Sequence, residues 1–284
     1  MSDLTYLQSV ILGIVEGLTE FLPVSSTAHL TIAEKLMGLE VDAPEVTAYT
    51  AIIQLGAIAA TFVYFFRDIV RLIGAWARGL VSAGAREHHD YWLAWAVIVG
   101  SIPVAVVGFA LRDLIAGPLR SLWVVAVALI LWSGVMWLAE SRHAKLAREE
   151  RVRGEGRVGV RDGIVIGLVQ CFSLVPGVSR SGATISAGLF RGIDRVTATR
   201  LSFFLAIPAL TAAVVYEAAT TDLSNLGTGQ MAVGVVVAFV VAYASIAWLL
   251  RFVASNTLKP FVIYRVALGL VLVVSLATGL VTAT

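Results

Sequence analysis

The sequence predicts an all-α polytopic membrane protein with six transmembrane helices and two re-entrant helix–loop–helix hairpins. Hydrophobic residues make up 58% of the 284 positions and charged residues only 14%, against roughly 25% charged in an average soluble domain. The mean hydropathy is +0.88, and long apolar runs alternate with short basic loops. A water-soluble chain of this length has no way to bury so much apolar surface.

The same composition excludes disordered chains, disulfide scaffolds and soluble nucleic-acid binders. Cys171 is the single cysteine, so it forms neither a disulfide framework nor a cysteine metal site. The sequence pI of about 8.8 arises from basic residues in short loops, which is typical of membrane topology and not of nucleic-acid binding. We expect no cleavable signal peptide, because Met1-Ser2-Asp3 lacks positive charge and the first apolar run contains Glu16 and Glu20.

Six apolar runs have about the 20 residues that a helix needs to cross a bilayer. They are approximately 47–66, 91–111, 122–139, 200–219, 230–250 and 262–282.

Two further apolar runs, about 4–37 and 162–190, are interrupted near their middle. The first breaks at Leu22-Pro23-Val24-Ser25-Ser26-Thr27 and the second at Pro176-Gly177-Val178-Ser179-Arg180-Ser181-Gly182. Irregular backbone at membrane depth is stable only where it is buried in protein or lines a wet cavity. Both runs are therefore interpreted as re-entrant hairpins.

The distribution of basic residues favours re-entrant hairpins over eight full spans. With both broken runs re-entrant, 17 of the 21 basic residues fall in the loops 67–90, 140–161, 191–200 and 251–265. Only Lys35, Arg112 and Arg120 lie on the other side, and Arg180 lies within a hairpin. The positive-inside rule then predicts that the basic loops are cytoplasmic and that both termini lie outside.

An internal repeat supports this topology. A shift of 154 positions places Gly13-Ile14-Val15-Glu16 on Gly167-Leu168-Val169-Gln170, and Val24-Ser25-Ser26-Thr27 on Val178-Ser179-Arg180-Ser181. The single domain 1–284 would contain two halves, about 1–140 and 160–284, joined by the basic cytoplasmic loop 141–161. Each half has one hairpin and three spans, so the second half is inverted and the two hairpin tips meet near the midplane.

The first hairpin concentrates polar groups. Glu16 and Glu20 are four residues apart and so share one helix face, and His29 follows beyond the Pro23 break. Ionisable groups inside a membrane segment indicate function, although a purely structural carboxylate pair is the alternative. The hydroxyls of Ser25, Ser26 and Thr27 are expected either to cap the next helix or to bind an anion at its N-terminus, and both can hold at once.

The second hairpin supplies a positive charge. Arg180 lies between Ser179 and Ser181 and is followed by Gly182, and Thr184 adds a further hydroxyl. An arginine at membrane depth needs an anion, and its planar fork suits phosphate. The structural alternative is a salt bridge from Arg180 to a glutamate of the other hairpin. Among the remaining candidates, His143 is expected on the surface because charged residues flank it.

The stretch Glu16-Gly17-Leu18-Thr19-Glu20-Phe21-Leu22-Pro23-Val24-Ser25-Ser26-Thr27-Ala28-His29, together with Pro176-Gly177-Val178-Ser179-Arg180-Ser181-Gly182-Ala183-Thr184, closely resembles the undecaprenyl-diphosphatase (bacitracin-resistance protein) family. The resemblance covers essentially the whole chain. One departure is Ala28, where the family pattern leads us to expect glycine before the histidine.

The resemblance implies a bacterial membrane enzyme that cleaves the terminal phosphate from undecaprenyl diphosphate to recycle the carrier lipid for cell-wall synthesis. It also implies a divalent metal and a site that is built from both motifs and opens on the periplasmic side of the bacterial inner membrane. The residues carried over by motif position are Glu16, Glu20, Ser25, Ser26, His29, Ser179, Arg180, Ser181 and Thr184. The expected partners are a polyprenyl diphosphate and membrane lipids, with no nucleic acid, and a homodimer is left open.

The residues themselves suit phosphoryl transfer, which needs alignment and charge neutralisation. Glu16 and Glu20 are the expected ligands of Mg²⁺ or Ca²⁺. Arg180 and the hydroxyls and amides of both tips, Thr27 and Gly182 included, are expected to hold the diphosphate. Ser26 is the expected nucleophile with His29 as general base or acid, while attack by water or by His29 stays open. The rival interpretation is a transporter or flippase for a phosphate-bearing lipid or anion, since inverted repeats with broken helices are common in transporters.

Overall fold

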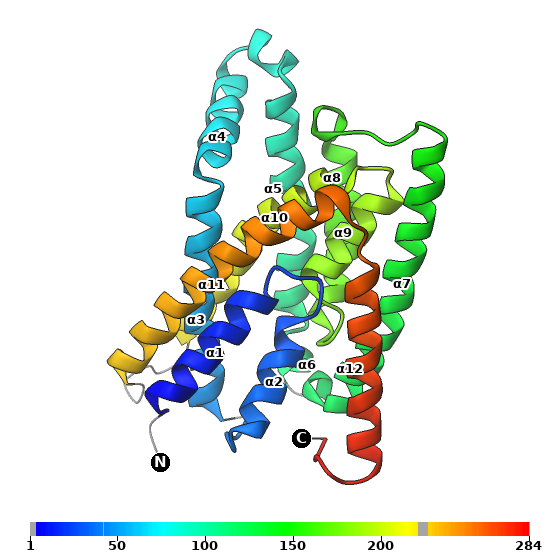
Figure 1. Cartoon of the computed structure of the whole chain (residues 1–284). Helices are drawn as coiled ribbons and strands as arrows, with labels where there is room; N and C mark the ends of the chain where they lie inside the picture. Colours follow the sequence, from blue (N-terminus) through cyan, green and yellow to red (C-terminus); the bar gives the residue numbers. More distant parts are fainter. Residues whose placement is uncertain (1–3, 42, 117, 221–226, 284) are drawn as a thin grey trace.

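The computed structural model describes residues 4–41, 43–116, 118–220 and 227–283, and this part of the chain is helical without a β-strand (Figure 1). Its α-helices are α1 (Tyr6–Thr19), α2 (Ser26–Leu36), α3 (Pro44–Tyr64), α4 (Phe66–Val81), α5 (His89–Ala110), α6 (Arg112–Ala116), α7 (Leu122–Arg148), α8 (Val160–Gln170), α9 (Arg180–Phe190), α10 (Arg195–Thr220), α11 (Thr228–Ser255) and α12 (Lys259–Ala277).

Six of the described helices are long and apolar enough to cross a membrane, which confirms the expected number. These segments are Glu45–Tyr64, His89–Ala110, Leu122–Arg148, Arg195–Tyr216, Thr228–Ser255 and Lys259–Ala277. Many of their large apolar side chains face outward, as on Leu131 of α7, Val240 of α11 and Val271 of α12, which are 67%, 59% and 60% exposed. In water this arrangement would be unfavourable, whereas in a bilayer the lipid chains cover these faces.

Helix α7 continues nine residues beyond the expected end of its span at position 139, and this corrects the expectation for His143. The side chain of His143 is only 4% exposed. Because the helix continues to Arg148, Met136, Glu140 and His143 recur on one buried face at helical spacing. The flanking charges had suggested a surface position, but Arg142 and Lys145 lie on the exposed part of the same helix.

Both interrupted apolar runs form a pair of short helices joined by a turn, α1–α2 and α8–α9. The four helices have 14, 11, 11 and 11 residues, or about 16–21 Å at 1.5 Å per residue. Each second helix begins after a serine in a left-handed conformation, Ser25 at φ 78° and Ser179 at φ 76°. Each serine hydroxyl accepts the backbone N–H three residues on, from Ala28 and Gly182 respectively. The two breaks are therefore built in the same way.

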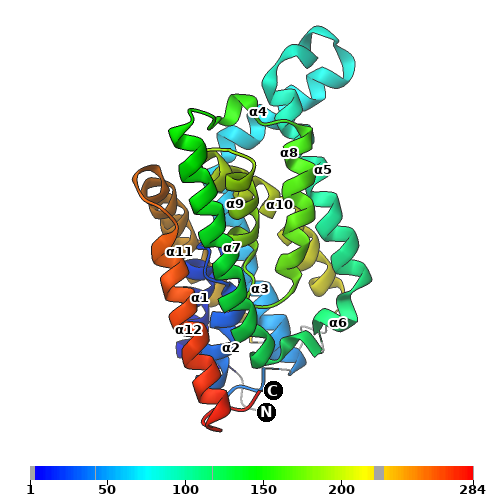
Figure 2. The same cartoon turned by 90° about the vertical axis from the view of Figure 1, so that its right-hand side faces the viewer.

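Small residues let each short pair pack closely against a helix from the other half of the chain. A Cβ added at Gly13 of α1 would lie 2.8 Å from the carbonyl oxygen of Gly234 in α11. A Cβ added at Gly167 of α8 would lie 2.0 Å from the carbonyl oxygen of Gly100 in α5. Such close backbone contact is typical of helix packing in membranes. It places α1 beside α11 and α8 beside α5, as both views show (Figures 1 and 2).

The end of α7 and the start of α8 lie at the end of the molecule toward which α4 extends (Figure 1). Ion pairs connect α4, α5, α10 and the loop before α8. Arg71 bonds to Asp68, Asp90 and Glu155, and Arg200 bonds to Asp68 and Glu155. The first turn of α1 and the last turn of α12 lie toward the opposite end (Figure 2).

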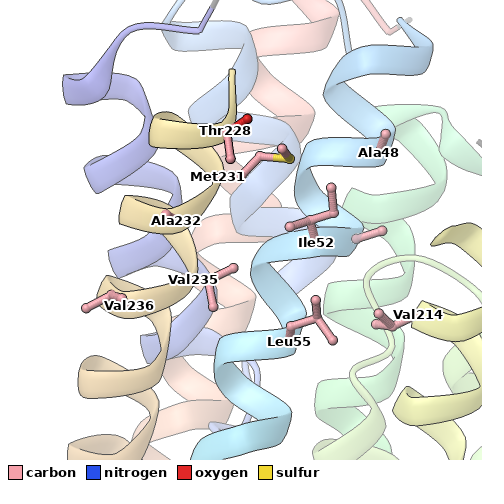
Figure 3. A pocket seen from close by; sticks show the side chains of 10 residues that line it. Ala48, Ile52, Leu55, Val214, Thr228, Met231, Ala232, Val235 and Val236 are labelled. Carbon is pink, nitrogen blue, oxygen red and sulfur yellow. The ribbon is translucent and has the colours of Figure 1, made fainter. Parts of the chain in front are cut away.

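An apolar hollow of about 490 Å³ lies between the N-terminal halves of α3 and α11, with Val214 of α10 at its side (Figure 3). Its lining consists of Ala48, Ala51, Ile52, Leu55, Val214, Thr228, Met231, Ala232, Val235 and Val236. None of these residues belongs to the polar motifs of the two turns, so this hollow is separate from the candidate site.

Candidate functional site

The turns of the two short helix pairs meet inside the bundle and form one polar cluster. Nη2 of Arg180, the first residue of α9, lies 3.2 Å from Oε1 of Glu20. The hydroxyl of Ser181 donates to the carbonyl oxygen of Leu22 at 3.0 Å. These contacts join residues about 160 positions apart, so they bring the two sequence motifs into one site as the repeat led us to expect.

Glu20 also accepts a hydrogen bond from Ser26. The Ser26 hydroxyl lies 2.7 Å from Oε2 of Glu20, while the other carboxylate oxygen faces Arg180. Glu20 is 7% exposed, and its partner Ser26 is half-buried at the first position of α2. A carboxylate that accepts from a hydroxyl can also take up its proton, and the neighbouring arginine can bind an anion.

The guanidinium of Arg180 is hydrogen-bonded through both terminal nitrogens, whereas its Nε has no partner in the part of the chain that the structure describes. Nη1 donates to the carbonyl oxygen of Ser202 at 3.0 Å, and Nη2 contacts Glu20. Nε is buried and has no hydrogen-bond partner among the described residues. Both interpretations of Arg180 are thus compatible with the geometry, because the salt bridge to Glu20 leaves a donor for an anion.

The hydroxyls around Arg180 are engaged with the protein. Ser179 lies 3.1 Å from Ser181 and caps Gly182. Thr184 donates to the hydroxyl of Ser202 at 2.7 Å. In the first turn Ser25 caps its helix, whereas the side chain of Thr27 is exposed. Except for Thr27, these side chains therefore stabilise the turns and the first turn of α9.

Glu16 is wholly buried, and neither of its carboxylate oxygens has a hydrogen-bond partner among the described residues. It interacts electrostatically with Glu20 and Arg180. Gln170, the residue 154 positions later, is also wholly buried with both side-chain polar atoms unpartnered. Buried polar atoms without partners are rare and need an explanation.

The donors of Glu16 and Glu20 fit a hard divalent cation. Carboxylate oxygens are what Mg²⁺ and Ca²⁺ prefer, and Mg²⁺ commonly uses one or two carboxylates and completes its shell with water and substrate phosphate. The described residues contain no group of three or more His, Cys, Asp or Glu side chains suited to a metal. A cation here would therefore take its remaining ligands from water and from the substrate phosphates.

His29 lies next to this cluster with both ring nitrogens occupied. Nδ1 is 2.7 Å from the carbonyl oxygen of Ser25, and Nε2 is 2.6 Å from the hydroxyl of Tyr264 in α12. The hydroxyl of Ser26 therefore donates to Glu20 and not to His29, the base that the sequence had suggested.

For Arg265 the position expected from the sequence is wrong. It was counted at the end of the basic loop 251–265, yet its side chain is fully buried in α12. Nη1 donates to the carbonyl oxygen of Pro23 at 3.3 Å and Nη2 to that of Gly177 at 2.8 Å, so one guanidinium holds both turns. A further bond joins Nε to Ser133. The available signal was an arginine inside a long apolar stretch, which indicates function at membrane depth.

Comparison with known proteins gives a consistent result. The sequence profile of the family described as "Bacitracin resistance protein BacA" matches residues 9–271. The chain is 53% identical to an undecaprenyl-diphosphatase of Cutibacterium acnes over 99% of this chain and 100% of the relative. It is 52% identical to undecaprenyl-diphosphatase 1 of Streptomyces avermitilis, with the same coverage, and 47% identical to an undecaprenyl-diphosphatase of Mycolicibacterium vanbaalenii, again with 99% and 100% covered.

Proposed function

Because the chain belongs to the bacitracin resistance protein BacA family, we propose that it is a multi-pass membrane enzyme that hydrolyses undecaprenyl diphosphate to undecaprenyl phosphate and inorganic phosphate. The product is the lipid carrier of cell-wall synthesis. The observation that carries the proposal is the meeting of Ser26, Glu20 and Arg180, contributed by two different turns. A nucleophile, a base and an anion-binding cation are the groups that phosphoryl transfer needs.

Ser26 is the proposed nucleophile and Glu20 its general base. The Ser26 oxygen would form a bond to the terminal phosphorus while its proton passes to Glu20. The bond between that phosphorus and the bridging oxygen breaks, and the electron pair leaves with undecaprenyl phosphate. Water then hydrolyses the phosphoserine, and the serine oxygen regains a proton. The 2.7 Å hydrogen bond from Ser26 to Glu20 supports Glu20 as the group that takes the serine proton. A Ser26→Ala variant that turns over at the wild-type rate would instead favour direct attack by water.

Arg180 is proposed to bind the phosphates through its free Nε and to stabilise the charge that develops on them. The N-termini of α2 and α9, which follow Ser25 and Ser179, would add backbone N–H donors for the phosphates. A divalent cation held by Glu16 and Glu20 would neutralise phosphate charge and polarise the bond that breaks. The two unpartnered oxygens of Glu16 support its place there.

We further propose that α1–α2 and α8–α9 are re-entrant hairpins of an inverted-topology repeat, with halves about 1–140 and 160–284. Each of the four helices is shorter than the roughly 30 Å hydrocarbon core. The matched serines 25 and 179, and the matched glycines 13 and 167, support the repeat. On this proposal the basic loops are cytoplasmic, and the termini and the site opening face the periplasm.

The test is phosphate release by the purified, detergent-solubilised protein supplied with a long-chain prenyl diphosphate. We expect release with wild type, loss of release on adding EDTA with recovery by Mg²⁺ or Ca²⁺, and loss in Arg180→Ala. Arg251→Ala is the matched control, because that arginine is exposed at the end of α11. Folded protein that binds the lipid without releasing phosphate would contradict the proposal and favour a lipid transporter.

A further inference from the structure

Two contacts, one at each ring nitrogen, determine the tautomer of neutral His29. The carbonyl oxygen of Ser25, 2.7 Å from Nδ1, only accepts hydrogen bonds, so Nδ1 carries the proton in the neutral ring. Nε2 is then an acceptor, and the hydroxyl of Tyr264, 2.6 Å away, donates to it. The second nitrogen of a histidine is commonly set in this way by what the first nitrogen contacts.

The position of Tyr264 is itself determined by its neighbours. Its ring stacks on the ring of His29 with centroids 5.6 Å apart and planes 13° from parallel. The next residue, Arg265, is bonded to the carbonyl oxygens of Pro23 and Gly177. The tyrosine therefore lies beside the same two turns that carry Ser26 and Arg180, and it is 45% exposed.

We propose that Tyr264 is a positioning residue of this site. Its hydroxyl, by donating to Nε2, holds the His29 ring in the orientation that keeps the Nδ1 proton on the Ser25 carbonyl oxygen and leaves Nε2 as an acceptor. Glu20 already accepts from Ser26, so His29 is the group available for the water that hydrolyses the phosphoserine. When the Tyr264 hydroxyl releases Nε2, that nitrogen orients the water and accepts its proton. This role rests on the proposed diphosphatase function, but the tautomer does not.

The experiment combines kinetics with ¹⁵N NMR of histidine-labelled, full-length protein, in which the His29 signals are assigned by their loss in His29→Gln. Tyr264→Phe keeps the ring and removes the hydroxyl. We expect kcat to fall about tenfold with KM nearly unchanged, as for one lost hydrogen bond, and the Nε2 signal to move downfield. Tyr243→Phe, a half-exposed tyrosine of α11, is the control and should change neither.

Unchanged kcat in Tyr264→Phe would overturn the proposal. So would a lower kcat with unchanged His29 signals, because Tyr264 would then act without His29. If wild type released no phosphate, the diphosphatase function and the catalytic part of this proposal would both fail. The NMR comparison would still decide whether the Tyr264 hydroxyl is hydrogen-bonded to Nε2 of His29.

Discussion

The two carboxylate oxygens of Glu20 contact different groups, one catalytic and one structural. One oxygen accepts from the Ser26 hydroxyl, and the other faces Arg180, which lowers the cost of keeping a buried carboxylate charged. A carboxylate in this position can take a proton from the serine while the arginine turns to an incoming phosphate. The salt bridge and the catalytic role are therefore compatible.

Replacing this base tests the assignment directly. In Glu20→Gln the amide keeps the size of the side chain but does not take up the serine proton, so kcat should fall about 10²- to 10⁴-fold. Phosphate release is the measurement, and Glu87→Gln, an exposed glutamate far along the chain, should stay at the wild-type rate. Activity within a few-fold of wild type would remove Glu20 from the role of base.

Arg265 has a structural role, which is to connect the two turns. Its guanidinium satisfies carbonyl oxygens from both turns that would otherwise lie buried without donors. No carboxylate is hydrogen-bonded to it among the contacts of the described residues, so the backbone carbonyls compensate its charge.

Arg265→Met should therefore separate the two turns. We expect the free energy of unfolding to fall by roughly 2–4 kcal/mol, since buried carbonyl groups lose their donors. The thermal midpoint in detergent measures this, with exposed Arg251→Met as the control. An unchanged midpoint would show that other contacts hold the turns together.

At the scale of elements, the site depends on how closely α1 and α8 approach their partner helices. Gly17 continues the glycine face of α1 against α11, where an added Cβ would lie 2.7 Å from the carbonyl oxygen of Ala238. Gly163 does the same on α8, at 2.1 Å from the carbonyl oxygen of Ala96. Because both short pairs are placed by backbone contact, a side chain added there displaces a whole turn of the site.

Gly167→Ala is the sharpest test, because its Cβ would meet the Gly100 carbonyl oxygen at 2.0 Å. We expect a lower thermal midpoint and a loss of activity, since α8 must move away from α5. Gly74→Ala in α4 is the matched control, because nothing lies within 4 Å of its added Cβ. There the substitution should be neutral or stabilise slightly, as glycine is a poor helix former. Equal effects at both positions would contradict the packing argument.

At the scale of the whole molecule, the two ends differ in chemistry. The ion pairs of Arg71 and Arg200 gather at the end that carries the basic loops, while α1 begins and α12 ends toward the other. This polarity agrees with the proposed orientation in the membrane.

Cysteine labelling of intact cells tests that orientation. In a Cys171→Ser background, a membrane-impermeant maleimide should label Thr278→Cys in intact cells and Glu87→Cys only after permeabilisation, because only the former side would face outward. Both positions are exposed, so accessibility within the protein is not limiting. The reverse pattern would invert the topology and place the site opening on the cytoplasmic side.

The amino-acid sequence by itself determined the membrane class, the six spans and the two breaks, because these depend on local hydropathy, proline and polar clusters. The internal repeat in the sequence also predicted that the two turns, which carry Glu20, Ser26 and Arg180, meet. Only the tertiary structure decided that Glu20 accepts from Ser26, that Tyr264 contacts His29 and that Arg265 joins both turns. These contacts join groups up to 242 positions apart. They depend on how helices pack and which way each side chain turns, and local sequence patterns do not contain that information.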